Sequence, residues 1–372
     1  LKNNPGMEMI DFGIGEPDEM AFEPIRASLK KEVDDPVNRG YSDNGIQEFK
    51  DAAARYMKNL YNVNLDPDTE IIHGIGSKPV LAMFPLIFIN PGDVTIMTVP
   101  GYPVMGTHTE YLGGKVYNLP LTKKNNFLPD LNSVPDDIRK NAKLLYLNYP
   151  NNPTGAGANV EFFRKAIEFA KKNNIIIVHD AAYAALNYKE KPLSFLSIDG
   201  AKEVGVEIQS MSKAFNMTGW RLAFVCGNAH VVKGYGTVKD NYDSGQFRAI
   251  QKAGIAGLDN FSLTENVRKK YERRLTRMVG VLKNKGFDAE LPYGTFYLYV
   301  EIPKGVKNGI SFNNAEDFSE YLIKEKLVST VPWDDAGHFF RMSATFVAKD
   351  EKDEERVLKE FENRLKDIEF IF

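Results

Sequence analysis

The feature that most constrains the fold is a series of short apolar runs with helical patterns between them. The five runs of strand length are residues 94–99, 144–148, 175–179, 206–209 and 222–226. Runs that are apolar at nearly every position are typical of strands buried on both faces, as in a parallel sheet. The alternation therefore predicts an α/β fold, in which a mostly parallel central sheet is flanked by helices.

One helical pattern lies upstream of the first run. Apolar side chains within residues 49–60 form a stripe with the spacing of one helix face, and residues 163–170 suggest another. We expect Asp43 or Asn44 to cap the first helix, because short polar side chains accept hydrogen bonds from its free N–H groups.

The pattern changes after about residue 257 and indicates a second, smaller α+β domain at the C-terminal end. We expect a long charged helix, a strand, a second helix, two further strands and a closing helix, at about residues 264–285, 295–302, 315–326, 327–331, 339–343 and 352–366. With 372 residues, the chain is long enough for two domains.

Charge and composition exclude several classes of partner. The net charge of −3 gives no reason to expect nucleic acid or an anionic membrane as a partner. No apolar run reaches the roughly 18 residues of a membrane span, and we expect a cytoplasmic protein. The five histidines lack metal-ligand spacing, so we expect no metal, and the single cysteine, Cys226, excludes an internal disulfide. The chain begins at Leu1 instead of Met, so we expect a native N-terminal segment to be missing.

Polar residues follow three consecutive runs at the point where each strand should end. Asn152 comes after the run that ends at residue 148, Asp180 ends the next run, and Lys213 follows the one after that. Ligands bind beyond the carboxyl ends of the strands in open α/β sheets. The three side chains are therefore expected at one site.

These residues are the groups that the aldehyde cofactor pyridoxal 5′-phosphate (PLP) needs. The Lys213 amine can form a Schiff base with the aldehyde and later move the substrate's α-proton. The Asp180 carboxylate would keep the pyridine nitrogen protonated, and Asn152 and Tyr183 could hydrogen-bond the phenolic oxygen. Hydroxyl and guanidinium groups for the phosphate could come from Ser210, Ser212 and Arg221.

Further motifs extend this pattern over nearly the whole chain. In type and in order, they resemble those of the fold-type I, class I/II aminotransferases, which are PLP enzymes. No single motif is specific, but the ordered set is improbable by chance. The carrying motifs are Gly13-Ile-Gly-Glu-Pro17, Tyr41 with Gly45, Gly76-Ser-Lys78, Pro100-Gly-Tyr-Pro103, Asn152-Pro-Thr-Gly155, Asp180 with Tyr183, Ser210-Met-Ser-Lys213, Arg221 and Phe340-Arg-Met-Ser343.

The resemblance implies roles for further residues around the cofactor. Ser77 and Lys78 form a phosphate cradle at a helix start, where backbone N–H groups favour an anion. The ring of Tyr102 stacks on the cofactor. Tyr41 reaches the phosphate of a neighbouring subunit, which implies a homodimer. A large PLP-binding domain would comprise residues 35–257, and residues 1–34 would join residues 258–372 in the small domain.

Two residues are expected to contact the substrate through its amino-acid head. Arg341 would bind the α-carboxylate, because a guanidinium can make two parallel hydrogen bonds to it. Gly15 would let the backbone approach the substrate closely. The resemblance also places Lys78, Tyr102 and Asn152 beside the substrate.

Within the family, the chain is most similar to the LL-diaminopimelate aminotransferases. This similarity implies transfer of an amino group between glutamate and tetrahydrodipicolinate, in lysine biosynthesis. The group has a substrate-contacting tyrosine upstream of the Gly13 segment, and this chain begins too late to contain it. The stretches that carry the similarity are residues 75–79, 98–103, 145–155, 178–183 and 239–246.

Three alternatives stay open at the level of sequence. Arg248 lies where relatives specific for dicarboxylates carry an arginine, so the substrate could be aspartate or another amino acid paired with 2-oxoglutarate. The residues alone do not separate transamination from racemisation, decarboxylation or β-elimination on PLP. A non-catalytic regulatory module with this fold is the third alternative, against which an intact Lys213, Asp180 and Arg341 argue.

Overall fold

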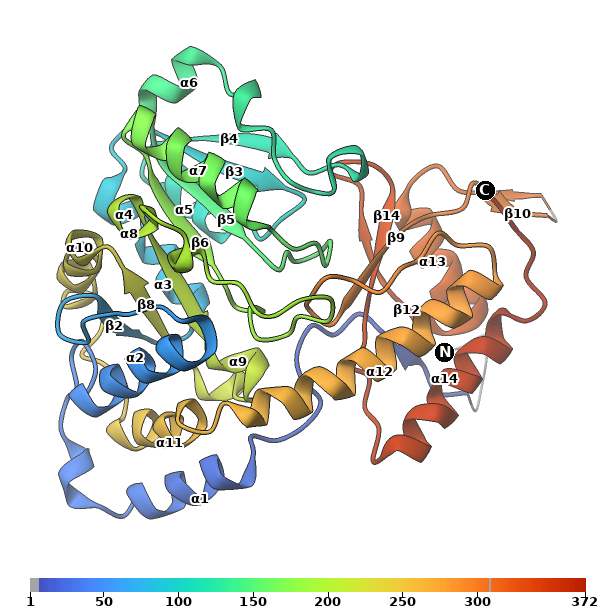
Figure 1. Ribbon diagram of the computed structural model, residues 1–372. Coiled ribbons are helices and arrows are strands. Elements are labelled where there is room, and N and C mark those ends of the chain that lie inside the picture. Colours follow the sequence, from blue (N-terminus) through green and yellow to red (C-terminus); the bar gives the residue numbers. More distant parts are fainter. Residues whose placement is uncertain (1–6, 308) are drawn as a thin grey trace.

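The chain forms two parts that a long helix connects. The computed structural model describes residues 7–307 and 309–372, so Leu1 lies outside the described residues. One part is built around a central sheet, and the other combines the C-terminal region with the start of the described chain. The connecting helix, α12 (Ser262–Asn284), runs from beneath the sheet to the second part (Figure 1).

The central sheet has seven strands and is mostly parallel, as the sequence predicts. In spatial order they are β2 (Ile71–Gly74), β8 (Ala223–Gly227), β7 (Gly205–Ser210), β6 (Ile176–Asp180), β5 (Ala142–Asn148), β3 (Val94–Val99) and β4 (Lys115–Pro120). Only β8 runs against its neighbours β7 and β2. The two strands at the sheet's edges, β2 and β4, were not predicted. β2 is only four residues long, and β4 is largely exposed and lacks a continuous apolar run.

Helices cover both faces of this sheet. Consecutive side chains of a strand point to opposite faces, and Leu144 and Leu145 accordingly lie in two different apolar clusters. One cluster includes residues of α2 (Gln47–Tyr61) and α7 (Val160–Asn173). The other includes residues of α3 (Ser77–Met83), α5 (Val104–Tyr111) and α10 (Ala229–Lys239). Both faces of the strands are therefore buried, which explains their apolar runs.

The N-terminal cap predicted for α2 is wrong. The helix begins after Ile46, and no side chain in the preceding turn caps it. The Ile46 N–H instead donates to Oε1 of Gln251, at 2.9 Å, and Asn44 donates to Asp240. A residue far along the chain thus accepts the hydrogen bond from the Ile46 N–H, which we expected a neighbouring side chain to accept.

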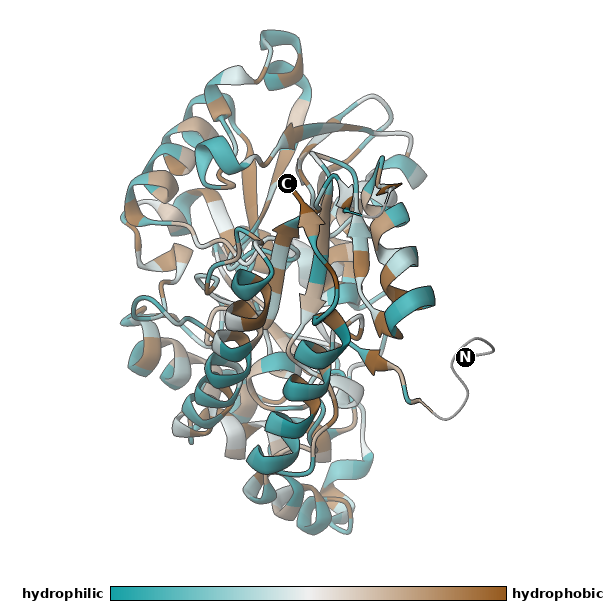
Figure 2. Cartoon of the chain, turned by 90° about the vertical axis from the view of Figure 1, so that its right-hand side faces the viewer, coloured by the Kyte–Doolittle hydropathy of each residue, from teal (hydrophilic) through white to brown (hydrophobic). Residues whose placement is uncertain are grey.

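The second part has its own apolar core. Strands β13 (Val331–Trp333), β14 (Phe339–Ser343) and β9 (Tyr297–Glu301) form an antiparallel sheet, and β1 (Ile10–Asp11) pairs with β12 (Val328–Ser329). Helices α12, α13 (Ala315–Lys326) and α14 (Glu351–Leu365) pack around this core. In Figure 2, hydrophilic residues follow much of the helices in front, and the strands behind them are largely hydrophobic.

The remaining elements are short, apart from two helices that pack together below the central sheet in Figure 1, α1 (Glu23–Glu32) and α11 (Arg248–Leu258). Ile25 of α1 lies in the same apolar cluster as α2 and α7. The division into residues 35–257 and residues 1–34 plus 258–372 stays a prediction, although α1 packs on the large-domain side. The short elements are α4 (Pro85–Phe88), α6 (Asp136–Asn141), α8 (Ala201–Val204), α9 (Met211–Ala214), β10 (Gly305–Val306), β11 (Ile310–Ser311) and β15 (Phe370–Ile371).

Candidate active site

A cavity of about 650 Å³ opens where the carboxyl ends of the parallel strands meet the second part. Twelve of the thirteen residues that the sequence proposes for the site line this one cavity, although they come from segments spread over the chain. They are Gly15, Ser77, Lys78, Tyr102, Asn152, Asp180, Tyr183, Ser210, Ser212, Lys213, Arg221 and Arg341. Their position is thus established, whereas the role of each remains a prediction.

Asp180 is a buried carboxylate at the end of β6. Its side chain accepts hydrogen bonds from the Tyr146 hydroxyl and the Ala182 N–H, each at 3.2 Å. The Asn148 amide donates to the Asp180 carbonyl at 2.8 Å and holds the backbone. Burial raises the pKa of Asp180 to about 6, and the two hydrogen bonds only partly oppose this rise. A cation beside this carboxylate would stabilise its charged form.

Lys213 lies in the short helix α9, directly after β7. Ser210 caps this helix through its hydroxyl, which accepts from the Ser212 N–H. The Lys213 amine donates to the Gly15 carbonyl at 2.9 Å, so it points across the cavity toward the second part. Burial lowers the pKa of Lys213 to about 8, and the nearby cations Arg221 and Arg341 add to this, whereas Glu16 opposes it. A substantial fraction of the amine is therefore neutral near physiological pH.

The end of the cavity near Arg221 collects donors for an anion. Arg221 has a left-handed backbone, with φ of 59°, and donates to the Thr218 carbonyl at 2.8 Å. A Cβ at Gly76, where φ is also positive, would overlap the Arg221 guanidinium, so only glycine allows this approach. Ser77, which follows Gly76 in the chain, and Ser210 also line the cavity.

The sequence identified no positioning residue for Arg221, but the structure contains one. The Gln246 side-chain amide donates to the carbonyls of Trp220 and Arg221, at 2.7 and 2.8 Å. Its oxygen pairs with Nε2 of His73 at 3.0 Å. Gln246 ends the stretch 239–246 that carries the family similarity, and this was the only signal that could have pointed to it.

Arg341 lines the cavity from β14, on the second part. Its guanidinium donates to the Asn152 side-chain oxygen at 2.9 Å and to the Gly13 carbonyl at 3.3 Å. It also lies over the ring of Tyr297, 4.1 Å from the ring centre. Its Nε is buried without a partner among the described residues. An unsatisfied donor on a fixed guanidinium suits a carboxylate ligand.

Tyr183 and Tyr297 also line the cavity. Their hydroxyls lie 3.1 Å apart, and the Tyr297 hydroxyl also lies 3.4 Å from the Gly15 carbonyl. Burial raises the pKa of the Tyr183 hydroxyl well above its usual value, so it stays protonated. The sequence predicted the strand that carries Tyr297 but gave no reason to place this side chain in the site.

Tyr41 is the one proposed residue that does not line this cavity. Its side chain is 78% exposed, and its carbonyl accepts two hydrogen bonds from Arg248, at 2.6 and 3.1 Å. Arg248 is likewise absent from the cavity lining, so the structure gives it a local partner instead of a substrate carboxylate in the same chain. The expected reach of Tyr41 into a neighbouring subunit stays a prediction.

The family follows from comparison with known proteins. The model of the family "Aminotransferase class I and II" matches residues 7–358. The chain belongs to the class I and II aminotransferase family. A relative in Methanocaldococcus jannaschii, named LL-diaminopimelate aminotransferase, is 60% identical, and the match covers 100% of this chain and 91% of the relative. A relative of the same name in Methanococcus maripaludis is 59% identical, with 99% and 90% covered.

The fold comparison agrees with the family. The solved structure of substrate-bound BacF from Bacillus subtilis is similar to this aminotransferase with a TM-score of 0.89 and 32% identity, covering 98% of this chain and 91% of that one. The chain is thus a PLP-dependent transaminase, as its relatives are, and the non-catalytic alternative is wrong. Within the described residues, no helix is long and apolar enough to cross a membrane, and no group of His, Cys, Asp and Glu side chains could hold a metal ion.

Proposed function

We propose that this transaminase interconverts tetrahydrodipicolinate plus glutamate and LL-diaminopimelate plus 2-oxoglutarate, in lysine biosynthesis. The observation that carries the proposal is the placement of the Lys213 amine in one cavity with the buried Asp180 carboxylate and the incompletely paired Arg341 guanidinium. The similarity to relatives of that name over nearly the full chain supports the choice of substrate.

The residues in the cavity fit PLP. Asp180 would pair with the ring nitrogen, whose positive charge would stabilise the carboxylate against the burial that raises its pKa. Arg221 would bind the phosphate together with Ser77, Ser210 and Ser212, which line the same cavity, as does Lys78. Asn152 and Tyr183 would hold the ring oxygen, and Tyr102 would cover the ring face. When bound, PLP supplies an electrophilic aldehyde and an electron-withdrawing ring.

Lys213 would act as the proton carrier of the reaction. Its lowered pKa makes a neutral amine available, and its amine lies beside the Gly15 carbonyl, on the side of the substrate. A neutral amine at this place can take the proton from the substrate's α-carbon. Arg341 would orient that carbon by binding the α-carboxylate, with Asn152 fixing the guanidinium.

The proposal includes a cytoplasmic homodimer. The exposed Tyr41 ring, on a loop that Arg248 holds through the backbone, is free to contact a second copy. The family resemblance would bring it to the phosphate of the neighbouring subunit. The aspartate-specific alternative rested on Arg248, and the bonding of Arg248 to Tyr41 gives it no specific support.

A half-reaction tests the proposed function. The purified protein with PLP is mixed with LL-diaminopimelate, glutamate, aspartate or alanine, one at a time, and the loss of the yellow absorbance is followed. Conversion by LL-diaminopimelate and glutamate, with slow or no conversion by aspartate and alanine, is the expected result. Conversion by aspartate alone would overturn the proposal in favour of a dicarboxylate enzyme.

A further inference from the structure

The cavity contains a carboxylate that the proposed function does not use. Glu16 lines the cavity together with Lys213 and Arg341, and its side chain is exposed there. Among the described residues, no hydrogen bond or ion pair to its carboxylate is found. Asp180 is the other acidic residue in the lining, and it is buried against Tyr146 and Ala182. Glu16 is therefore the acidic group in this lining that is available to a ligand.

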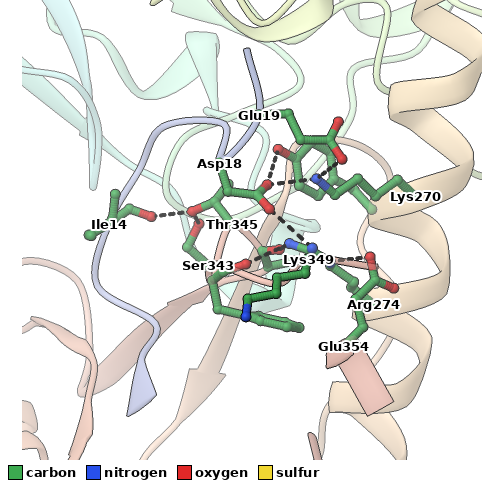
Figure 3. A network of polar contacts seen from close by, with 12 residues as sticks. Ile14, Asp18, Glu19, Lys270, Arg274, Ser343, Thr345, Lys349 and Glu354 are labelled. Carbon is green, nitrogen blue, oxygen red and sulfur yellow. Dashed lines mark hydrogen bonds and ion pairs between the residues drawn. The ribbon is translucent and has the colours of Figure 1, made fainter. Parts of the chain in front are cut away.

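The backbone on both sides of Glu16 is fixed. The Ile14 carbonyl accepts a hydrogen bond from Thr345 at 2.6 Å, and the Gly15 carbonyl accepts from Lys213. On the other side, the Asp18 carboxylate is buried and pairs with Lys270 at 2.8 Å and with Arg274 at 3.1 Å. Figure 3 shows the contact of Ile14 with Thr345 and the pairs that Asp18 forms with Lys270 and Arg274.

Arg274 makes this attachment rigid. Arg274 lies on α12, and its side chain is buried. It also pairs with Glu354 and donates to the carbonyls of Ala344 and Phe346, at 2.8 to 2.9 Å. Every one of these partners lies in α14 or in the segment just before it. Glu16 thus lies on a short loop whose backbone is held on both sides, so the point from which its side chain extends is set before any ligand arrives.

The same cavity also contains a cation that is available to a ligand. Lys78, at the start of α3, is exposed, and no hydrogen bond or ion pair to its amine is found among the described residues. The cavity therefore has an arginine for one carboxylate and, in addition, one available cation and one available anion. A second amino-acid head, with its carboxylate and its ammonium, needs these two charges.

We propose that Glu16 accepts the distal ammonium group of a diamino dicarboxylic acid and thereby determines substrate specificity. The inference rests on the proposed function and names the residue that separates this substrate class from simple dicarboxylic amino acids. Glutamate and aspartate have no second ammonium, so their reaction should not depend on this contact. The rival interpretation is that the Glu16 carboxylate only favours the protonated form of the nearby Lys213 amine. Its removal would then change the reaction of all substrates alike.

The test compares Glu16→Gln with Glu23→Gln, which makes the same change at an exposed position at the start of α1, outside the cavity lining. Three amino donors are used in the half-reaction: LL-diaminopimelate, glutamate and L-2-aminopimelate. The last has the carbon chain and distal carboxylate of diaminopimelate but lacks the distal amine. Glu16→Gln should lower the second-order rate constant with LL-diaminopimelate about 10- to 100-fold, the loss expected for one hydrogen bond to a charged group. With glutamate and L-2-aminopimelate, the change should stay within about threefold.

Each other outcome has a distinct meaning. An equal loss with all three donors would overturn the inference in favour of an effect on Lys213. An unchanged rate with LL-diaminopimelate would overturn it too. If the unsubstituted protein does not react with LL-diaminopimelate at all, the proposed function fails instead. Glu16→Asp keeps the charge and should restore part of the discrimination, and thermal unfolding with PLP bound identifies a variant that has lost its fold.

Discussion

The cavity has two walls, and their residues are brought together in different ways. One wall comes from the central sheet, and the other comes from the two ends of the chain. On the sheet side, Asp180 and Lys213 stand where consecutive strands end. On the other side, Gly15 and Arg341 are more than 300 residues apart in the chain and meet through backbone contacts at Gly13 and buried ion pairs at Arg274. The first wall depends on local position, and the second depends on packing between distant segments.

Removal of Lys213 should have the largest effect, because it takes the proton-carrying amine from the sheet-side wall. We expect Lys213→Ala to lower the half-reaction rate about 10⁴-fold or more, the upper range for loss of an acid–base group. Rapid mixing with LL-diaminopimelate measures it. Lys233→Ala, on α10 and outside the cavity lining, is the control. A residual rate within about tenfold of the original would show that another group carries the proton.

The second prediction concerns the wall formed by the two ends of the chain, whose stability should depend on the buried ion pairs of Arg274. Arg274→Met removes one of the two cations that pair with each buried carboxylate, Asp18 and Glu354, and breaking such a buried network should cost about 3 kcal/mol. Arg277→Met, one turn along the same helix, breaks the exposed pair with Glu355 and should cost less than about 1 kcal/mol. Urea unfolding of both variants gives the two free energies. Equal losses would mean that the buried network does not hold the second wall.

The same contrast explains what the sequence could predict. The strand-end rule placed Asn152, Asp180 and Lys213 in one site, because parallel strands bring their carboxyl ends together whatever the rest of the chain does. The family resemblance added Arg341 and Gly15, but it did not give the contacts that hold them. The Arg274 network and Tyr297 could not be predicted, because their partners are set by packing between segments that no local pattern relates.

The fold shows the same limit on a smaller scale. The runs on β3, β5, β6, β7 and β8 were predictable because both faces of these strands are buried. The edge strand β4 was not, since its exposed face removes the signal. The cap expected from Asp43 or Asn44 failed for a related reason, because Gln251 reaches the Ile46 N–H across the fold.

A pH-dependent prediction concerns the carboxylate of the sheet-side wall. Burial raises the pKa of Asp180 to about 6 in the folded, cofactor-free protein, from about 4 in an unfolded chain. The folded state then holds a proton that the unfolded state releases, so stability falls as the pH rises from about 4 to about 6. Asp180→Asn carries no such charge and should be about 3 kcal/mol more stable than the original at pH 7, with little difference at pH 4. Urea unfolding at the two pH values measures this.

A surface carboxylate serves as the control for Asp180. Glu161→Gln removes a surface carboxylate whose pKa is lowered by Lys165, so it should not stabilise the protein at pH 7. If Asp180→Asn destabilises the cofactor-free protein equally at both pH values, the Asp180 carboxyl contributes through its hydrogen bonds and not through its buried charge.

The smallest effect concerns Gln246, whose side-chain amide holds the turn at Arg221 through the backbone carbonyls of Trp220 and Arg221. Gln246→Ala removes two hydrogen bonds to the turn that aims the guanidinium, and each is worth about 1 kcal/mol. We expect PLP to bind about tenfold more weakly, as measured by fluorescence titration. Pyridoxal, which lacks the phosphate, should bind as before, and Gln47→Ala, at an exposed amide, should change neither. If pyridoxal loses affinity equally, Gln246 supports the cavity as a whole, and the sheet-side wall then depends on distant packing in the same way as the other.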